Sequence, residues 1–166
     1  LVADAQKLQT LPADPAVKKG VLPNGTNYYI VSNPSAKGMA DFALVQKTGA
    51  NTVPGVSEVK ALQVAQEALD ASPRLLSGSV QSYFVSLGVV PDRDGFVKVS
   101  DNATVFRFND VMLSQKADLM DSTLVVMLDM IDRANVTEDP FIRRWYAPSD
   151  QALIIAGDVD PKSIAE

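Results

Sequence analysis

The sequence contains no histidine and no cysteine. The missing cysteines exclude disulfides, iron–sulfur clusters and thiolate zinc sites. The missing histidines exclude Ser-His and Cys-His nucleophile pairs, imidazole acid–base catalysis near neutral pH and any metal held by imidazole. Few common enzyme designs remain, so any catalysis would have to depend on carboxylates, hydroxyls and amines.

Long apolar runs and an excess of positive charge are also lacking. The longest apolar runs, such as residues 152–156, are far shorter than the roughly 20 residues that are needed to cross a bilayer. The 15 Lys and Arg residues are scattered and are outnumbered by 20 Asp and Glu, which gives a net charge of −5. Nucleic-acid-binding proteins gather cations to neutralise phosphates. We therefore expect neither a membrane span nor a nucleic-acid partner.

The apolar content is sufficient for one globular domain. The chain has 166 residues, 46% of them apolar, and a chain of this length buries about two thirds of its unfolded surface. Pro12 and Pro15 interrupt any helix near the start of the chain. We therefore expect a lead-in over residues 1–16 and a single α/β domain, truncated or shortened, over residues 17–166.

The first half of the domain begins with a predicted β-hairpin. Residues 17–22 and 26–31 are rich in β-formers and flank Asn24 and Gly25, a pair that supplies the positive φ values of a tight turn. A third strand is predicted over residues 39–48. These three strands are expected to form a meander.

Three helices are predicted from apolar residues at helical spacing. The first begins at Ser57, and the second covers residues 75–87 and ends at Gly88. The third covers residues 113–131, and Ser114 is expected to be its N-cap.

The second half of the chain contributes further strands. Two are predicted over residues 96–99 and 103–108, and residues 151–157 have the continuous apolar character of a central strand covered on both faces. Asp160 is expected to cap a final helix that begins at Pro161. This order of elements predicts an α+β fold, with a mixed, mainly antiparallel sheet and helices packed on one face.

Three short motifs resemble those of serine β-lactamases and penicillin-binding proteins. Ser57 and Lys60 fit S-x-x-K, residues 100–102 fit S-D-N, and residues 47–49 fit K-T-G. The order along the chain is wrong, because K-T-G comes last in those enzymes. A strand end, a helix start and a turn explain the three matches better.

Two acidic pairs are candidates for metal binding or acid–base work. Asp92 and Asp94 resemble the start of a calcium loop, but the spacing and the terminal Glu of such a loop are absent. Glu67 and Asp70 lie one helical turn apart and could serve as acid and base. Turn chemistry and a solvated helix face are the simpler explanations of the two pairs.

Two segments resemble the insulinase-like or pitrilysin-type zinc metallopeptidases. Residues 17–31, VKKGVLPNGTNYYIV, are similar to the family's opening hairpin, x-L-x-N-G-L-x-Y-Y-I. Residues 141–148 and 152–161 resemble the family's F-x-x-x-W-Y-x-P and A-L-x-x-x-G-D-V-D-P. The segments occur in the family's order, and the resemblance covers most of the domain.

The resemblance implies a degenerate N-terminal-type half that has lost the zinc motif. The family's His-x-x-Glu-His aligns with residues 64–68, where only Glu67 remains, at the position of the general base. Val64 and Ala68 stand at the two zinc-ligand positions. Only residues 134–140 lie in the interval where the family carries its third ligand on a helix, so we expect the ligand-bearing helices to be missing. We therefore expect no metal, no cofactor and no catalytic residue.

The resemblance suggests a non-catalytic domain with a docking, scaffolding or substrate-holding role beside an active partner domain. The alternative is the component of a two-part zinc endopeptidase that does not carry the metal and acts on peptides with its partner. The expected partners are another peptidase-like domain or chain and an unfolded peptide. The lead-in resembles that of exported bacterial members, which suggests the periplasm or cell envelope.

Overall fold

The structure, a computed structural model, describes residues 14–52, 54–70, 78–133 and 138–166. Its centre is a six-stranded sheet with the strand order β1-β2-β6-β3-β5-β4. The strands are β1 (Val17–Val21), β2 (Asn27–Ser32), β3 (Met39–Gln46), β4 (Val97–Val99), β5 (Thr104–Met112) and β6 (Gln151–Gly157). β2 and β6 are parallel and the other neighbouring pairs are antiparallel, so the sheet is mixed and mainly antiparallel, as predicted.

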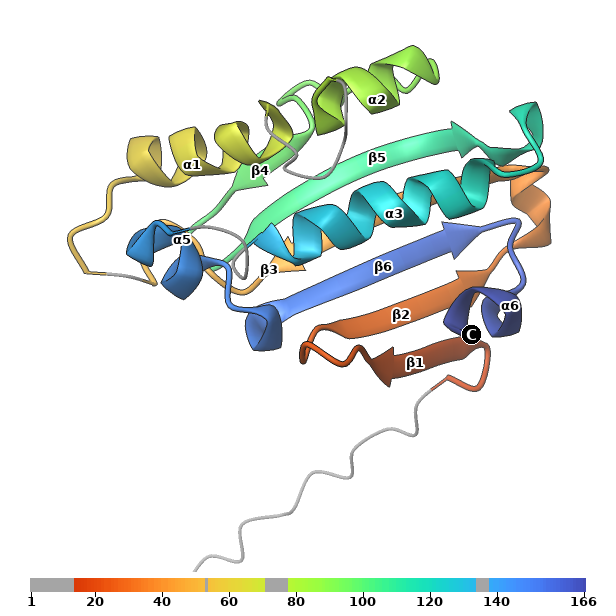
Figure 1. Cartoon of the computed structure of the whole chain (residues 1–166), viewed down its shortest axis with the longest axis horizontal. Coiled ribbons are helices and arrows are strands. Elements are labelled where there is room, and N and C mark those ends of the chain that lie inside the picture. The colour runs from red at the N-terminus through yellow and green to blue at the C-terminus, as the bar shows by residue number, and fades with distance from the viewer. Residues whose placement is uncertain (1–13, 53, 71–77, 134–137) are drawn as a thin grey trace, which may run out of the picture.

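Helices cover one face of this sheet, which confirms the predicted fold class (Figure 1). They are α1 (Glu58–Asp70), α2 (Val80–Ser86), α3 (Leu119–Ile131), α5 (Pro140–Trp145) and α6 (Pro161–Ala165). In the view of Figure 1, α3 and α6 lie in front of the strands. No helix in the described part of the chain is long and apolar enough to span a bilayer.

The core lies between the helices and the strand side chains that point toward them. Phe42 of β3 and Phe106 and Phe108 of β5 are almost completely buried there. Phe84 of α2 stacks on Phe108, with ring centroids 3.7 Å apart and planes 9° from parallel. This aromatic packing fixes α2 over the β5 side of the sheet.

The predicted three-strand meander is wrong. β1 and β2 form the expected hairpin around Gly25, whose φ is 96°. β6 then lies between β2 and β3, pairing Asn27 with Ala152 on one side and Ala152 with Val45 on the other. β6 is the strand with the most continuous apolar sequence, so its central position is favourable, but only tertiary pairing places it there.

β6 is central, as predicted, yet it is not covered on both faces. Leu153 and Ile155 are buried beneath the helices, whereas Ala152, Ile154 and Ala156 alternate with them and stay half-exposed. The continuous apolar run therefore conceals a strand with one buried and one open face.

The start of the third predicted helix is also corrected. β5 continues to Met112, which pairs with Met39 of β3, and Leu113–Gln115 form a 3-10 turn. Ser114 lies in that turn, so it is not an N-cap, and α3 begins at Leu119. Residues 113–118, which the apolar spacing predicted to be helical, instead follow the end of β5, where its last residue pairs with β3.

The predicted start of α6 and the predicted end of α2, which depend on neighbouring residues alone, agree with the structure. Asp160 caps α6 by accepting a hydrogen bond from the Lys162 backbone nitrogen at 3.2 Å, and Pro161 is the first helical residue. The second predicted helix appears as α2, which is followed by Gly88 with φ 80°. Residues 75–77 of that prediction, and residues 1–13 of the lead-in, lie outside the described residues.

A row of polar side chains is buried at one end of the sheet. Gln46 of β3 pairs across the sheet with Thr104 on one side and Gln151 on the other, and all three are almost fully buried. Thr104 Oγ1 donates to the Thr48 carbonyl at 2.8 Å, and Gln151 Nε2 donates to the Tyr146 carbonyl at 3.1 Å. The Gln46 amide oxygen and nitrogen have no hydrogen-bond partner in the structure.

We predict that Gln46→Met raises the free energy of unfolding by about 1 kcal/mol, because a buried polar group without a partner is unfavourable. Urea denaturation followed by circular dichroism measures this. The control Gln151→Met should not share this gain, because the removal of its own unpartnered Oε1 is offset by the loss of the hydrogen bond to the Tyr146 carbonyl. A loss of stability in Gln46→Met would mean that the amide is hydrogen-bonded, for example through buried water.

Candidate functional site

α1 carries the positions that align with the family's zinc motif. Ser57 precedes the helix, and its Oγ accepts a hydrogen bond from the Lys60 backbone nitrogen at 3.2 Å. Apolar side chains three and four positions apart form one stripe that packs into the core. The buried members are Ala61, Val64, Ala65, Ala68 and Leu69.

The residues present do not fit a zinc ion. Val64 and Ala68, at the two ligand positions, are 2% and 4% exposed and lie in the core. Their side chains end in methyl groups and have no donor atom, whereas a catalytic zinc site needs about three protein ligands. Among the described residues, no group of three or more possible ligands comes together. Glu67 alone could not hold the ion.

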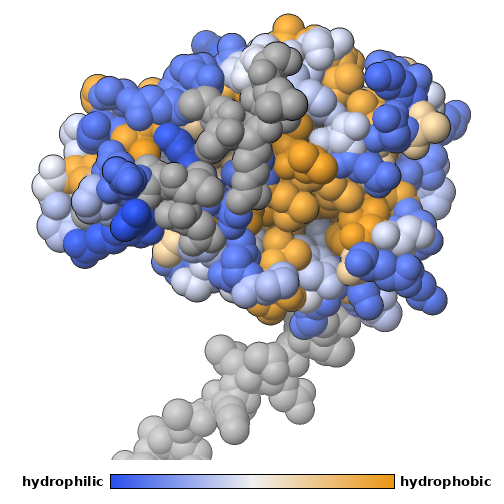
Figure 2. Space-filling view, viewed as in Figure 1, coloured by the Kyte–Doolittle hydropathy of each residue, from blue (hydrophilic) through white to orange (hydrophobic). Residues whose placement is uncertain are grey.

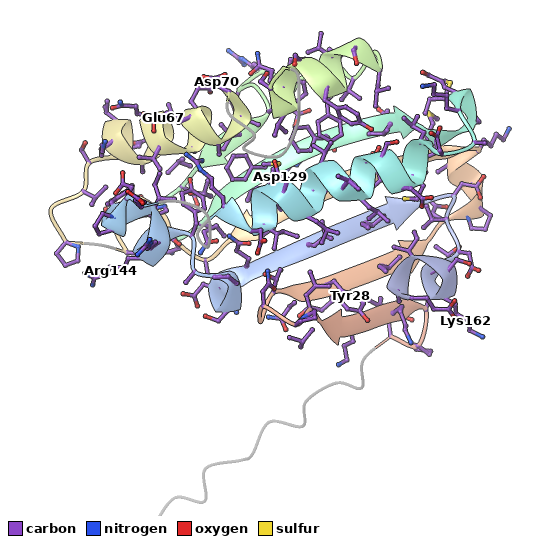
Figure 3. The ribbon with its side chains drawn as sticks, in the orientation of Figure 1. Tyr28, Glu67, Asp70, Asp129, Arg144 and Lys162 are labelled. Atoms are coloured by element: carbon purple, nitrogen blue, oxygen red, sulfur yellow. The ribbon has the colours of Figure 1, made fainter. Side chains whose placement is uncertain are left out.

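Glu67 and Asp70 lie on the exposed side of α1 (Figure 3). Gln63 Nε2 donates to Glu67 Oε1 at 3.2 Å, one helical turn away. Both carboxylates line a shallow hollow of about 410 Å³ that also includes Val59 and Leu62. The structure therefore places the predicted acidic pair on an open surface and not in an enclosed pocket.

A second hollow continues this surface onto the edge of the sheet. Leu62 lines both hollows, and Glu58, Asp94 and Val99 also line the second. β4 is the last strand of the sheet, so it presents backbone groups to which another strand can pair. We call this region the α1–β4 surface. It consists of Glu58, Val59, Leu62, Gln63, Gln66, Glu67, Asp70, Asp94, Val97, Lys98 and Val99.

A cation lies on the inner side of α1, where sequence patterns gave no sign of it. Arg133 Nη1 donates to the Val64 carbonyl at 3.2 Å, and its guanidinium carbon is 5.5 Å from the Tyr146 ring centroid. Burial lowers the pKa of Arg133, and burial likewise raises the pKa of Tyr146. Arg133 thus ties the end of α3 to the middle of α1 and to the residue that follows α5.

The serine-hydrolase motifs have structural roles. Ser57 Oγ caps α1, and Ser100 Oγ donates to the Ala103 carbonyl at 3.1 Å within a turn. Thr48 Oγ1 donates to the Trp145 carbonyl at 2.7 Å. Asp92 of the acidic turn accepts from Arg107 at 3.3 Å. Capping, turn and ion-pair contacts therefore account for these side chains.

An apolar groove lies on the helix side between α3 and α6, where Figure 2 shows apolar side chains gathered. It has a volume of about 110 Å³. We call it the α3–α6 groove. Its lining residues are Leu22, Tyr28, Ile30, Leu124, Leu128, Leu153, Ile155, Ile164 and Ala165.

No protein-family model and no curated protein matches this chain. Solved structures do match. The first half of the periplasmic protease PqqL from Escherichia coli superimposes with a TM-score of 0.73 at 15% identity, over 95% of this chain and 46% of that one. The ferredoxin protease FusC, solved as a point mutant in complex with Arabidopsis ferredoxin, gives a TM-score of 0.70 at 19% identity, over 90% of this chain and 23% of that one.

A third match is the peptidase M16 inactive domain from Pseudomonas fluorescens, with a TM-score of 0.62 at 10% identity over 90% of this chain and 49% of that one. This chain therefore spans between about a quarter and a half of the length of these structures. Matches at probability 1.00 also include pitrilysin and an insulinase-family protease from Yersinia pestis. The chain has the fold of a domain of the insulinase- and pitrilysin-type, or M16, peptidases.

Proposed function

We propose that this chain is a non-catalytic peptidase-like domain that holds an extended peptide beside an active partner domain. One observation carries the proposal. On α1, the zinc-ligand positions Val64 and Ala68 are buried in the core, while the outer side of the same helix remains open. The helix keeps a surface that a peptide can reach but has no group to hold a metal.

The α1–β4 surface supports peptide holding. Its apolar centre, with Val59 77% and Leu62 44% exposed, can bury side chains of a peptide. An extended peptide could add by backbone hydrogen bonds to β4, beyond which no further strand lies in the described part of the sheet. Because Glu58, Glu67 and Asp70 surround the apolar centre, the favoured peptide alternates apolar and basic residues.

The structural neighbours support a role within a larger assembly. They include a domain named inactive and a protease solved together with ferredoxin, and each of those chains is at least twice as long as the part this chain matches. We propose that a second peptidase-like domain or chain supplies the catalytic groups. PqqL is described as periplasmic, and we propose an exported location for this chain as well.

A second candidate is the non-metal component of a two-part zinc endopeptidase. The match to the first half of PqqL, which is described as a protease, favours it. The two candidates differ in one respect. In the second, cleavage requires this chain and appears only after mixing with a partner that carries an intact His-x-x-Glu-His helix.

We predict that the isolated chain neither binds zinc stoichiometrically with a Kd below about 1 μM nor cleaves an unstructured peptide. We expect this because catalytic zinc requires about three protein ligands, and Glu67 is the only possible ligand at the aligned positions. Isothermal titration with zinc and a fluorogenic peptide assay measure the two properties. Tight one-to-one binding, or cleavage that a chelator abolishes, would contradict the proposal.

We also predict that Leu62→Ser weakens binding of a fluorescent peptide of alternating Val and Lys by about tenfold, which is about 1.4 kcal/mol. The substitution removes the apolar side chain at the centre of the α1–β4 surface without changing its charge. Fluorescence anisotropy measures the affinity. Leu128→Ser is the matched control, because Leu128 is 41% exposed against 44% for Leu62 and lies in the α3–α6 groove. Equal losses in both variants would argue against this surface.

A further inference from the structure

The layer of described helices is incomplete over β1 and β2. In Figure 1, α6 lies in front of one end of this strand pair, while α3 runs alongside β6. One row of helix-facing side chains runs from Gly20 of β1 through Tyr28 to Leu153 of β6. Tyr28 lies over Gly20, where a Cβ atom would collide with the tyrosine ring. The apolar floor therefore extends to the edge of the sheet.

The α3–α6 groove continues along α3 into a second hollow. This hollow has a volume of about 350 Å³ and shares Leu22 and Leu128 with the groove. We call the groove and the hollow together the α3–hairpin trough. The remaining lining residues of the hollow are Pro23, Asn24, Ile131 and Asp132.

The α3 wall of the trough is as long as two turns of a helix. It extends from Leu124 to Ile131, which are seven residues apart and therefore separated by about 10 Å. Leu128, in the middle of this wall, is 41% exposed. Covering such apolar surface removes it from water, which is favourable.

The chain enters β1 beside this trough. The Val17 nitrogen donates to the Asp14 carbonyl at 3.0 Å, and the Ala16 nitrogen donates to Asp14 Oδ1 at 2.9 Å. A turn of this kind reverses the chain. The preceding residues are therefore directed back along β1, toward Leu22 and the far end of the trough.

The lead-in is long enough to reach the trough. Its residues 9–13 can span up to about 17 Å. β1 lies one strand spacing, about 4.8 Å, from β2, whose residues Tyr28 and Ile30 line the trough. Residues 1–8 are then left to lie along the α3 wall.

The sequence of the lead-in has the apolar pattern that the trough requires. Leu1, Ala5 and Leu8 are four and three positions apart, which is the spacing of one helix face. Leu1 and Leu8 are separated by seven residues, as are Leu124 and Ile131. Pro12 follows this stretch and would end a helix there.

Pairing of the lead-in with β1 as an additional strand is less favourable. β1 is the last strand on its side of the described sheet, but Pro12 has no N–H to donate to it. Leu8 and Leu11 are three positions apart, whereas a strand with one buried face repeats every two residues.

We propose that the α3–hairpin trough binds the lead-in of the same chain, with Leu1, Ala5 and Leu8 against the α3 wall. The direction set by the turn places Leu8 near Leu124 and Leu1 near Ile131. This contact covers apolar surface that the described elements leave open, and it leaves the α1–β4 surface free. It is independent of peptide holding, so either proposal can fail without the other.

Disulfide cross-linking tests this contact, because the chain has no cysteine of its own. Ala5→Cys is combined with Leu128→Cys, a position in the middle of the trough. The matched control combines Ala5→Cys with Leu62→Cys, a position on α1 that is 44% exposed. Under mild oxidation in dilute solution, the first pair should form an intramolecular disulfide at least tenfold faster than the control. Non-reducing electrophoresis and peptide mass spectrometry measure the two rates.

A second substitution shows whether the apolar face of the lead-in drives the contact. Leu8→Asp, added to the first pair, should slow cross-linking about tenfold, because it puts a charge against the apolar wall. Gln6→Asp is the matched control and should leave the rate unchanged, since residue 6 lies off the face formed by Leu1, Ala5 and Leu8.

Circular dichroism checks that each variant is folded, and Leu124→Cys replaces Leu128→Cys if the latter is not. Equal rates for the trough pair and the control pair would overturn the proposal. So would a rate that Leu8→Asp leaves unchanged, or disulfides that form only between two chains.

Discussion

The packing of the apolar stripe of α1 onto one face of the sheet is the constraint on which the rest of the structure depends. Val64 and Ala68 lie in that contact, and burying a valine side chain stabilises a fold by about 1.5–3 kcal/mol. The sequence resemblance sets these two positions against zinc ligands of the insulinase-like peptidases. In this chain they are part of the core, and the Arg133 guanidinium donates to the Val64 carbonyl.

The packing of the helices on one face of the sheet also determines which surfaces of the protein remain exposed. Because the helices cover one sheet face, β6 has a buried and an open side, and the open side carries Ala152, Ile154 and Ala156. The hollows around α1 and β4 are shallow and lie on the surface. These surfaces are the basis of the proposal that the molecule holds other polypeptides, and the structures that share its fold extend beyond the part matched here.

The candidate site could be predicted only in part. The alignment of residues 64–68 with the zinc motif identified Glu67, and helical periodicity correctly placed Val64 and Ala68 on the buried stripe. The contact between Arg133 and Val64 joins residues 69 positions apart, and the link between Leu62 and β4 depends on how α1 lies over the sheet. No local pattern encodes such contacts, so sequence reasoning missed Arg133 and Tyr146.

The sequence by itself determined the features that depend on neighbouring residues: the hairpin turn at Gly25, the buried stripe of α1 and the Asp160 cap of α6. Each is governed by backbone angles or hydrogen bonds within a few positions. Only the tertiary structure decided that β6 enters between β2 and β3, that β5 extends into the predicted helix, and that one sheet face stays open. Strand pairing joins segments far apart in the chain, and its energy depends on the whole sheet.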